Sequence, residues 1–330
     1  MRVFGRILLV LLVFAAAIYL FNASWFAPPP DDPQIRLIAH RGVHQTFSHD
    51  GLTNETCTAE RIYPPVHDYL ENTVASAQAA FELGADVVEF DIAPTSDGQL
   101  AVFHDWTIDC RTEGHGDVRD FALADLQALD IGFGYTADGG KSFPFRGKGT
   151  GLLPDIAGMF EGTVGGEFLI NFKSNDAEEA DLLAERLEEN PDWLNRTWSA
   201  YGGQAPSDKI NQLLPGLEAF GSKAARDCLV RYIALGWTGM MPESCHNTKI
   251  MVPLNFTWLI WGWPNRFLER ARTAGSDVVL IGPVDLANAG TTGIDTPELL
   301  SEVSPAFDGY IWTNRIDLIG PLVKGTAPLT

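Results

Sequence analysis

Two histidines in this sequence stand where a strand is expected to end, each beside a residue that can work with it. His40 is followed by Arg41 and Gly42, and His104 is followed by Asp105. An imidazole transfers protons near neutral pH, and a guanidinium can clamp two phosphate oxygens. Either dipeptide alone is more often structural, but two histidines at equivalent strand ends favour acid–base chemistry on an anionic substrate.

A second pattern places two carboxylates and a lysine at strand ends. Glu89 and Asp91 lie two positions apart in an expected strand, so their side chains point to the same side. Two like charges held that close indicate a cation, and hard oxygen ligands favour Mg²⁺ or Ca²⁺; a salt-bridged pair is the alternative. Asn171 and Lys173 also share a face, and a lysine in a barrel mouth requires an anion such as phosphate.

These residues need a scaffold of strands and helices, and the hydrophobic pattern supplies one. Strands are predicted at Ile35–Ala39, Val87–Ile92, Leu100–Phe103, Glu167–Phe172, Arg196–Ala200, Ile250–Leu254, Asp277–Ile281 and Gly309–Thr313. Helices are predicted at Val74–Leu83, Ala122–Leu129, Glu178–Glu189, Ser222–Leu235, Asn265–Ala274 and Pro297–Val303. This alternation predicts an α/β fold in which a parallel sheet closes into a TIM-type (β/α)8 barrel.

One connection departs from that pattern. The segment Thr95–Gly98, which contains an Asp-Gly turn signal, leaves no room for a helix between two predicted strands. Either the crossover is very tight or one of the two strands is assigned wrongly. The long irregular stretch His44–Asp68 follows the first strand, and we expect it to form a wall of the site.

The composition limits the classes of partner. The 330 residues carry 23 basic and 43 acidic side chains, a formal net charge of −20. Such a surface repels nucleic-acid phosphates and anionic head groups, so we expect no nucleic-acid partner and no polybasic lipid-binding site. No pattern in the sequence specifies a protein partner.

The N-terminus carries a targeting signal. Arg2 and Arg6 precede an apolar run, Ile7–Phe21, that is short for a membrane span; extension to Ala27 brings it to about 20 residues. The flank predicts a signal anchor, with a cleaved leader as the alternative. The domain would then lie outside the cytoplasm, in the cell envelope, and in the periplasm if the source is bacterial. Residues 1–30 are therefore predicted as anchor and proline-rich spacer, and residues 31–330 as the barrel domain.

The chain has four cysteines, and none shows the spacing of a metal site. An even count in an exported chain is typical of disulfides. We predict the pairs Cys57–Cys110 and Cys228–Cys245, with four free thiols as the alternative.

Several motifs together resemble the glycerophosphodiester phosphodiesterase family of TIM-barrel enzymes in order and spacing. The resemblance covers residues 35–320 and is most specific from 37 to 112. Its motifs are Leu37–Gly42, Glu71–Thr73, Gly84–Asp86, Glu89–Asp91, Thr95–Gly98, His104–Asp105 and Arg111–Thr112, with weaker similarity at Gly114–Asp120, Leu126–Asp130 and Thr313–Arg315.

The resemblance implies a barrel enzyme with one divalent cation. It implies that His40 and His104 are the acid and the base, and that the cation is held by Glu89 and Asp91. Glu71 matches a site-lining glutamate of the family, either a ligand or a partner behind the ligands. The resemblance further implies that the remaining positions, Arg41 and Lys173, contact the phosphate.

The chain departs from the family pattern at Asn171, where a metal-binding glutamate is usual. An amide still offers one carbonyl oxygen, but it removes one negative charge from the ligand set. A weaker or more Ca²⁺-like site is expected. Glu167 lies too far back along the strand to replace the missing carboxylate, whereas Asp176 on the following loop is a candidate.

The function that follows is metal-dependent hydrolysis of glycerophosphodiesters to an alcohol and glycerol 3-phosphate. One alternative on the same fold is phospholipase-type cleavage of lysophospholipids or sphingomyelin, for which Trp258, Trp261, Trp263 and Trp312 would line an apolar groove. Packing in the core or barrel lip is the commoner role of such residues. A further alternative is a phosphodiester-binding protein without catalysis.

Overall fold

The structure, a computed structural model, describes residues 2–53, 56–285 and 292–329. Within these residues nine strands form one sheet. Eight of them follow the order β6-β5-β4-β2-β1-β9-β8-β7, and β3 pairs with β2 outside this series. Their bounds are β1 Ile35–Ala39, β2 Val87–Pro94, β3 Leu100–Val102, β4 Glu167–Phe172, β5 Thr197–Gly202, β6 Phe220–Gly221, β7 Lys249–Pro253, β8 Asp277–Ile281 and β9 Gly309–Thr313.

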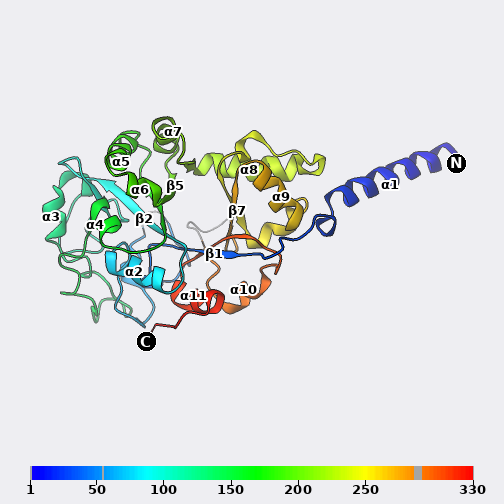
Figure 1. Cartoon of the computed structure of the whole chain (residues 1–330). Helices are drawn as coiled ribbons and strands as arrows, with labels where there is room; N and C mark the ends of the chain where they lie inside the picture. The colour runs from blue at the N-terminus through cyan, green and yellow to red at the C-terminus, as the bar shows by residue number, and fades with distance from the viewer. Residues whose placement is uncertain (1, 54–55, 286–291, 330) are drawn as a thin grey trace.

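Helices lie around the outside of this sheet (Figure 1). The α-helices are α1 Arg2–Asn22, α2 Val74–Glu82, α3 Leu123–Gln127, α4 Ile156–Glu161, α5 Glu178–Glu189, α6 Pro191–Asn195, α7 Gln204–Leu213, α8 Ser222–Leu235, α9 Asn265–Thr273, α10 Pro297–Glu302 and α11 Ile316–Lys324. Short 3-10 helices include η1 Ser24–Phe26, η2 Ala59–Arg61, η3 Val118–Asp120, η4 Gly236–Thr238, η5 Glu243–Cys245 and η6 Leu254–Leu259.

The eight strands of the series are all parallel and form a nearly closed barrel. Its two end strands, β6 and β7, are connected along the chain by α8, and no ladder joins them in the described part of the chain. The predicted TIM-type barrel is therefore confirmed. A parallel barrel brings the carboxyl end of every strand to one rim, which is where the candidate catalytic residues stand.

The predicted strand Leu100–Phe103 is not part of the barrel. β3 pairs antiparallel with β2, with Ile92 opposite Val102, so the two strands form a hairpin. The Asp-Gly turn closes it, which is why no helix is needed between them. The eighth barrel strand is instead β6, which the sequence analysis missed because it has only two residues and one of them is Gly221.

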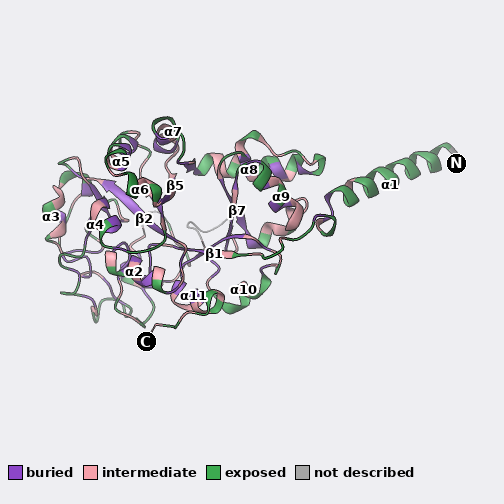
Figure 2. Ribbon diagram, viewed as in Figure 1, coloured by how far each residue is buried: buried purple, intermediate pink, exposed green. Residues whose placement is uncertain are grey.

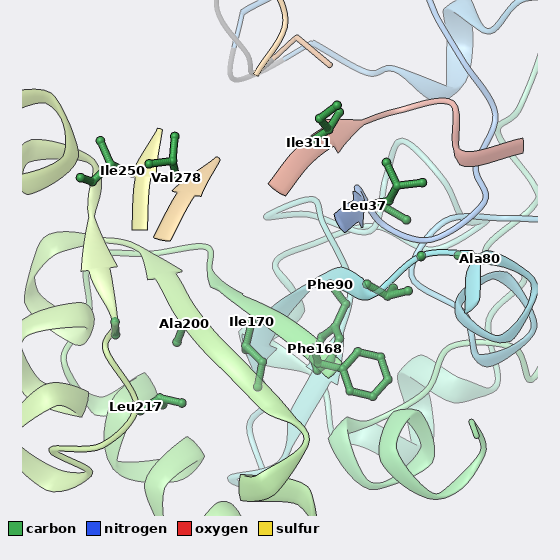
Figure 3. Packing of buried hydrophobic residues seen from close by; sticks show 14 of the residues in the cluster. Leu37, Ala80, Phe90, Phe168, Ile170, Ala200, Leu217, Ile250, Val278 and Ile311 are labelled. Atoms are coloured by element: carbon green, nitrogen blue, oxygen red, sulfur yellow. The ribbon is translucent and has the colours of Figure 1, made fainter. Parts of the chain in front are cut away.

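Alternation along the strands separates two apolar layers. Residues such as Leu37, Phe90, Phe168 and Ile170 point outward and pack under the helices (Figure 3). The intervening positions point inward, and their apolar members fill the barrel with a second cluster: Ile38, Val87, Leu169, Phe220, Val279, Ile281, Tyr310 and Trp312. Because side chains alternate along a strand, Glu89, Asp91 and Asn171 lie on the same inward face as Val87 and Leu169.

A third apolar cluster lies beside the barrel and belongs to the long connection between β2 and β4. It includes Phe103, Ile108, Leu126, Tyr135 and Phe145, and residues of the loop after β1 also pack in it. This small core gives the β2–β4 connection a fixed shape without long helices. It thereby holds the segment that carries His104.

Both predicted disulfides are confirmed. Cys57 bonds to Cys110 and ties the loop after β1 to the β2–β4 connection. Cys228 of α8 bonds to Cys245 of η5. The burial map shows strands buried and α1 exposed along its length (Figure 2). The domain boundary at residue 30 stays a prediction.

Replacing both cysteines of each pair by alanine should lower the free energy of unfolding by different amounts. The Cys57–Cys110 link spans 53 residues and the Cys228–Cys245 link spans 17. A longer closed loop loses more chain entropy, so we expect losses of about 4 and about 3 kcal/mol respectively. Urea unfolding of both double variants measures this. Equal stability of wild type and variants would contradict the expectation.

Candidate active site

The end of β1 is a tight turn that presents His40 and Arg41. Arg41 has φ 56° and Gly42 has φ 72°, so two successive residues adopt the left-handed region. A Cβ on Gly42 would lie 2.8 Å from the carbonyl carbon of Ser76, and only glycine fits there. The Arg41 carbonyl accepts hydrogen bonds from Ser76 Oγ at 2.9 Å and from the Asn72 amide at 3.2 Å, which hold the strained turn.

Glu89 and Asp91 are buried at the end of β2, and each is held by hydrogen bonds. Glu89 accepts from the Arg41 amide at 3.1 Å and from the Tyr201 hydroxyl at 2.8 Å. Asp91 accepts from Asn72 Nδ2 at 2.9 Å and lies 3.4 Å from Arg41 Nε. The salt-bridged pair that the sequence left open is therefore partly realised, because the Arg41 guanidinium pairs with Asp91 but only the Arg41 backbone amide reaches Glu89.

The two carboxylates have opposite pKa shifts. Burial and the charge of Asp91 raise the pKa of Glu89 to about 8. Burial alone would raise the pKa of Asp91 too, but Lys173, His104 and Arg41 hold it well below its usual value. Lys173 Nζ lies 3.7 Å from Asp91 Oδ1. The surrounding cations thus stabilise the ionised form of Asp91, whereas Glu89 has too little positive charge around it to offset its burial.

His40 is oriented by a chain of two hydrogen bonds. Its Nδ1 lies 2.6 Å from Asn314 Oδ1, and Asn314 Nδ2 donates to Asp295 at 2.8 Å. A carboxylate only accepts, so it fixes the Asn314 amide and thereby places the proton of His40 on Nδ1. Nε2 then carries a lone pair, which accepts from Arg41 Nε at 3.2 Å. Burial, and then Arg41, lower the pKa of His40 well below 6.5.

His104 has a charged partner instead of an amide. Its Nδ1 lies 2.6 Å from Asp105 Oδ1, and Arg111 Nε donates to Asp105 Oδ2 at 2.8 Å. Burial opposes ionisation of Asp105, but Arg111 and His104 hold its pKa well below the usual range. Burial, and then Arg41, lower the pKa of His104, while Asp91 and Asp105 oppose this shift.

Glu71 binds the two buried arginines. One of its oxygens accepts from Arg41 Nη1 at 2.9 Å, and the other lies 3.1 Å from Arg111 Nη1. Both oxygens of Glu71 thus contact guanidinium groups. This arrangement favours a role in positioning Arg41 over a role as a metal ligand. Asp176, the candidate for the missing carboxylate, lies 2.9 Å from Arg119 in an ion pair.

Asn171 lies beside the carboxylate pair that the sequence analysis proposed as ligands of a divalent cation. Its Nδ2 donates to Asp91 Oδ1 at 2.8 Å, so its carbonyl oxygen would face a cation only after the amide turns over. In the described residues no three His, Cys, Asp or Glu side chains form a metal-binding group. Two carboxylates and one amide nevertheless suit a hard cation with water among its ligands, and the positive charge would relieve the repulsion at Glu89.

Sequence reasoning assigned no role to several residues that orient this site. Asn72 and Asn314 stood inside quoted motifs, whereas Tyr201 and Asp295 carried no local signal at all. Trp312 was named only as a possible groove residue. Its ring is buried 4.9 Å from the His40 ring, and no described residue accepts a hydrogen bond from its Nε1.

The other tryptophans do not share a groove with Trp312. Trp258 is 78% exposed, Trp261 donates to the Ile233 carbonyl, and Trp263 packs against Phe307. A separate cavity of about 90 Å³ borders the site. Asp105, Trp106 and Lys173 are among its lining residues, so it opens space for part of a ligand beside the catalytic candidates.

Known sequences match the same part of the chain. The profile of the glycerophosphoryl diester phosphodiesterase family matches residues 40–207, about half of the chain. A glycerophosphodiester phosphodiesterase of Caldanaerobacter subterraneus subsp. tengcongensis is 40% identical over 103 residues, 31% of this chain and 39% of that protein. Glycerophosphodiester phosphodiesterase 1 of Rattus norvegicus is 41% identical over 119 residues, 36% of this chain and 32% of that protein. The matched segment thus spans less than half the length of these relatives.

Solved structures are similar over nearly their whole length. The glycerophosphoryl diester phosphodiesterase domain of a Mycobacterium tuberculosis protein superposes with a TM-score of 0.60 at 18% identity, covering 87% of this chain and 97% of that one. A phosphodiesterase of Oleispira antarctica, solved with the product sn-glycerol-3-phosphate, gives 0.51 at 18% identity, covering 90% and 97%. These similarities show the barrel fold. Together with the sequence match over residues 40–207, they show that the chain belongs to the glycerophosphoryl diester phosphodiesterase family.

Proposed function

We propose that this protein hydrolyses glycerophosphodiesters to an alcohol and glycerol 3-phosphate with the help of one divalent cation. The observation that carries the proposal is the grouping of two differently partnered histidines, His40 and His104, around one buried carboxylate pair at the barrel rim. The glycerol 3-phosphate bound to the Oleispira antarctica relative supports the choice of substrate class.

His40 is the general base in this proposal. Its amide partner Asn314 holds the proton on Nδ1. Burial lowers the pKa of His40 and keeps the ring neutral, although the hydrogen bond with Asn314 opposes this shift. The lone pair on Nε2 accepts a proton from the attacking hydroxyl, which belongs to water or to the glycerol moiety of the substrate. Attack by the glycerol hydroxyl would give a cyclic phosphate that water then opens.

His104 is the general acid. Asp105 accepts from its Nδ1 and stays ionised beside Arg111, so its negative charge favours the imidazolium form. A proton on Nε2 can then pass to the leaving alkoxide. The difference between a neutral amide behind one histidine and a carboxylate behind the other supports this division of roles.

Arg41 and Lys173 supply positive charge for the phosphate. Arg41 Nε lies 3.4 Å from Asp91 Oδ2, and Lys173 Nζ lies 3.7 Å from Asp91 Oδ1. Both cations are thus next to the carboxylate pair that would hold the metal ion. Glu89, Asp91 and the Asn171 carbonyl would bind that cation, Ca²⁺ or Mg²⁺. When bound, it supplies Lewis-acid stabilisation of charge on the phosphate oxygens.

Single substitutions of the two histidines should abolish most turnover. We expect His40→Ala and His104→Ala each to lower kcat for glycerophosphocholine by about 100-fold or more, because each removes one proton transfer. His115→Ala is the matched control, since that side chain is 83% exposed. Choline release by the full chain with Ca²⁺ or Mg²⁺, and then with excess EDTA, is the measurement.

Near-wild-type turnover in both histidine variants would sink the assignment. Choline release that continues unchanged in EDTA would show that the reaction needs no divalent cation. If glycerophosphocholine is inert while lysophosphatidylcholine is cleaved, the lipid-cleaving alternative replaces the one proposed. Tight binding of glycerophosphocholine without turnover would indicate a binding protein.

The pH profile should separate the base from the acid. The base works unprotonated, so a lowered pKa of His40 keeps kcat/KM intact below pH 6.5 and lets it fall only as pH drops through that lower pKa. Asp105→Asn removes the charge that favours protonated His104, so the basic limb should move to lower pH while the acidic limb stays. Movement of the acidic limb alone would reverse the two roles.

Restoring a carboxylate at position 171 should strengthen cation binding. Asn171→Glu adds a charged ligand beside Asp91, so we expect Ca²⁺ to bind about 10-fold more tightly by calorimetry. Without a cation the same variant should melt at a lower temperature than wild type, because the carboxylates repel and the amide hydrogen bond is lost. Asn195→Glu, at the exposed end of α6, controls for added charge. An unchanged affinity for Ca²⁺ in Asn171→Glu would exclude this position from the ligand set.

A further inference from the structure

Helix α1 projects away from the barrel domain instead of packing on it (Figure 1). Its segment Val3–Asn22 has a mean hydropathy of 2.5 and is unburied, and it is long and apolar enough to cross a membrane. The helix is a single straight rod (Figure 1), and it is exposed along nearly all of its length up to the buried Asn22 (Figure 2). At 1.5 Å per residue, its 21 residues span about 31 Å, the thickness of a bilayer's hydrocarbon core.

The last residue of this helix is fixed to the barrel domain. Asn22 is buried, and its Nδ2 donates to the Trp237 carbonyl at 2.9 Å and to the Ile18 carbonyl at 3.0 Å. Its Oδ1 accepts from Arg270 Nη1 at 3.0 Å. Arg270 lies on α9, so the side chain of Asn22 joins α1 to two separate elements of the barrel.

The residues on either side of Asn22 add to the attachment. The Phe21 ring lies under the Arg270 guanidinium, with 5.6 Å from Cζ to the ring centroid. A Cβ on Gly239 would come within 2.7 Å of the same ring, so the two segments are in close contact. Asn265 is the first residue of α9. Its backbone N–H donates to Ser24 Oγ at 3.0 Å, and its Nδ2 donates to the Ala27 carbonyl at 3.2 Å.

Aromatic side chains surround this junction. Tyr19, Trp25 and Phe26 are 60%, 64% and 59% exposed, and the Tyr19 and Trp25 rings lie 5.7 Å apart. Met240 and Trp237, which flank the attachment point on the barrel, are 67% and 38% exposed. Tyrosine and tryptophan at the end of an apolar helix are typical of the membrane–water interface.

From these contacts we infer that α1 stays in the mature protein and seats the barrel directly on the bilayer, with Trp237–Met240 in the interfacial layer. Cleavage after Asn22 would leave Arg270 and the Trp237 carbonyl without the side-chain amide that pairs with both. The short, hydrogen-bonded path from Asn22 to Ala27 leaves no slack for a flexible stalk. The partner is a lipid bilayer, and the inference does not depend on the phosphodiesterase activity.

The first test combines mass and fluorescence. The full chain is expressed in its exporting host, its intact mass is measured, and it is reconstituted in phosphatidylcholine vesicles with brominated acyl chains. We expect residues 1–22 to be retained and the brominated lipid to quench part of the tryptophan emission. Trp25→Phe and Trp237→Phe should each reduce the quenched fraction. Trp106→Phe should not, because Trp106 lines the cavity beside Asp105 and Lys173, whereas α1 is attached to the barrel domain at η4 and α9.

The second test addresses the rigid seating. Asn22→Leu keeps α1 apolar but removes its polar attachment, so chymotrypsin should cut after Phe26 at least about 10-fold faster than in wild type, since local opening exposes the junction. Asn195→Leu, on exposed α6, should be cut there at the wild-type rate. Loss of residues 1–22 from the mature chain, equal quenching of all variants, or equal cleavage of Asn22→Leu and wild type would each overturn the inference.

Discussion

The guanidinium of Arg41 lies among groups that cannot be left unpaired at a buried barrel rim. It contacts Glu71, Asp91 and His40, and the backbone amide of the same residue donates to Glu89. Breaking a buried ion pair by removing one partner costs about 3–5 kcal/mol, because the remaining charge has lost its counterion. Arg41 therefore has to remain where it is for Glu71 and Asp91 to remain ionised, and the left-handed turn at the end of β1 places it there.

This dependence extends outward from the rim through a second arginine. Arg111 is fully buried and connects Glu71 to Asp105, and it also contacts the hydroxyls of Tyr135 and Thr58. The His40 side of the site thus rests on the barrel, whereas the His104 side rests on the small core beside it. The two histidines belong to differently supported halves, and Glu71 is the residue that joins them.

Much of this arrangement was predictable from local pattern. Strands that are buried on both faces are visible in the sequence as apolar runs. Polar residues at the carboxyl ends of these runs, such as His40 and Asp91, do not contribute to an apolar core, so a role in a site was the natural interpretation. β6 was not predictable, since two residues give no periodicity. The antiparallel direction of β3 is set by the turn that precedes it, so the apolar pattern of the strand alone could not show that β3 lies outside the barrel. Partners such as Asn314 lie 274 positions from His40, and spacing along a chain holds no information about such a contact.

The Cys57–Cys110 bond makes the His104 side of the site depend on the redox conditions in which the chain folds. Cys110 directly precedes Arg111, and the bond ties that segment to the loop after β1. A newly made chain in a reducing cytosol has two thiols at this place, so the segment that carries Arg111 is held only by the small core. Oxidation then locks Arg111 against Glu71 and Asp105. The conformation of the segment that carries Arg111 would therefore depend on whether the chain folds under oxidising or reducing conditions.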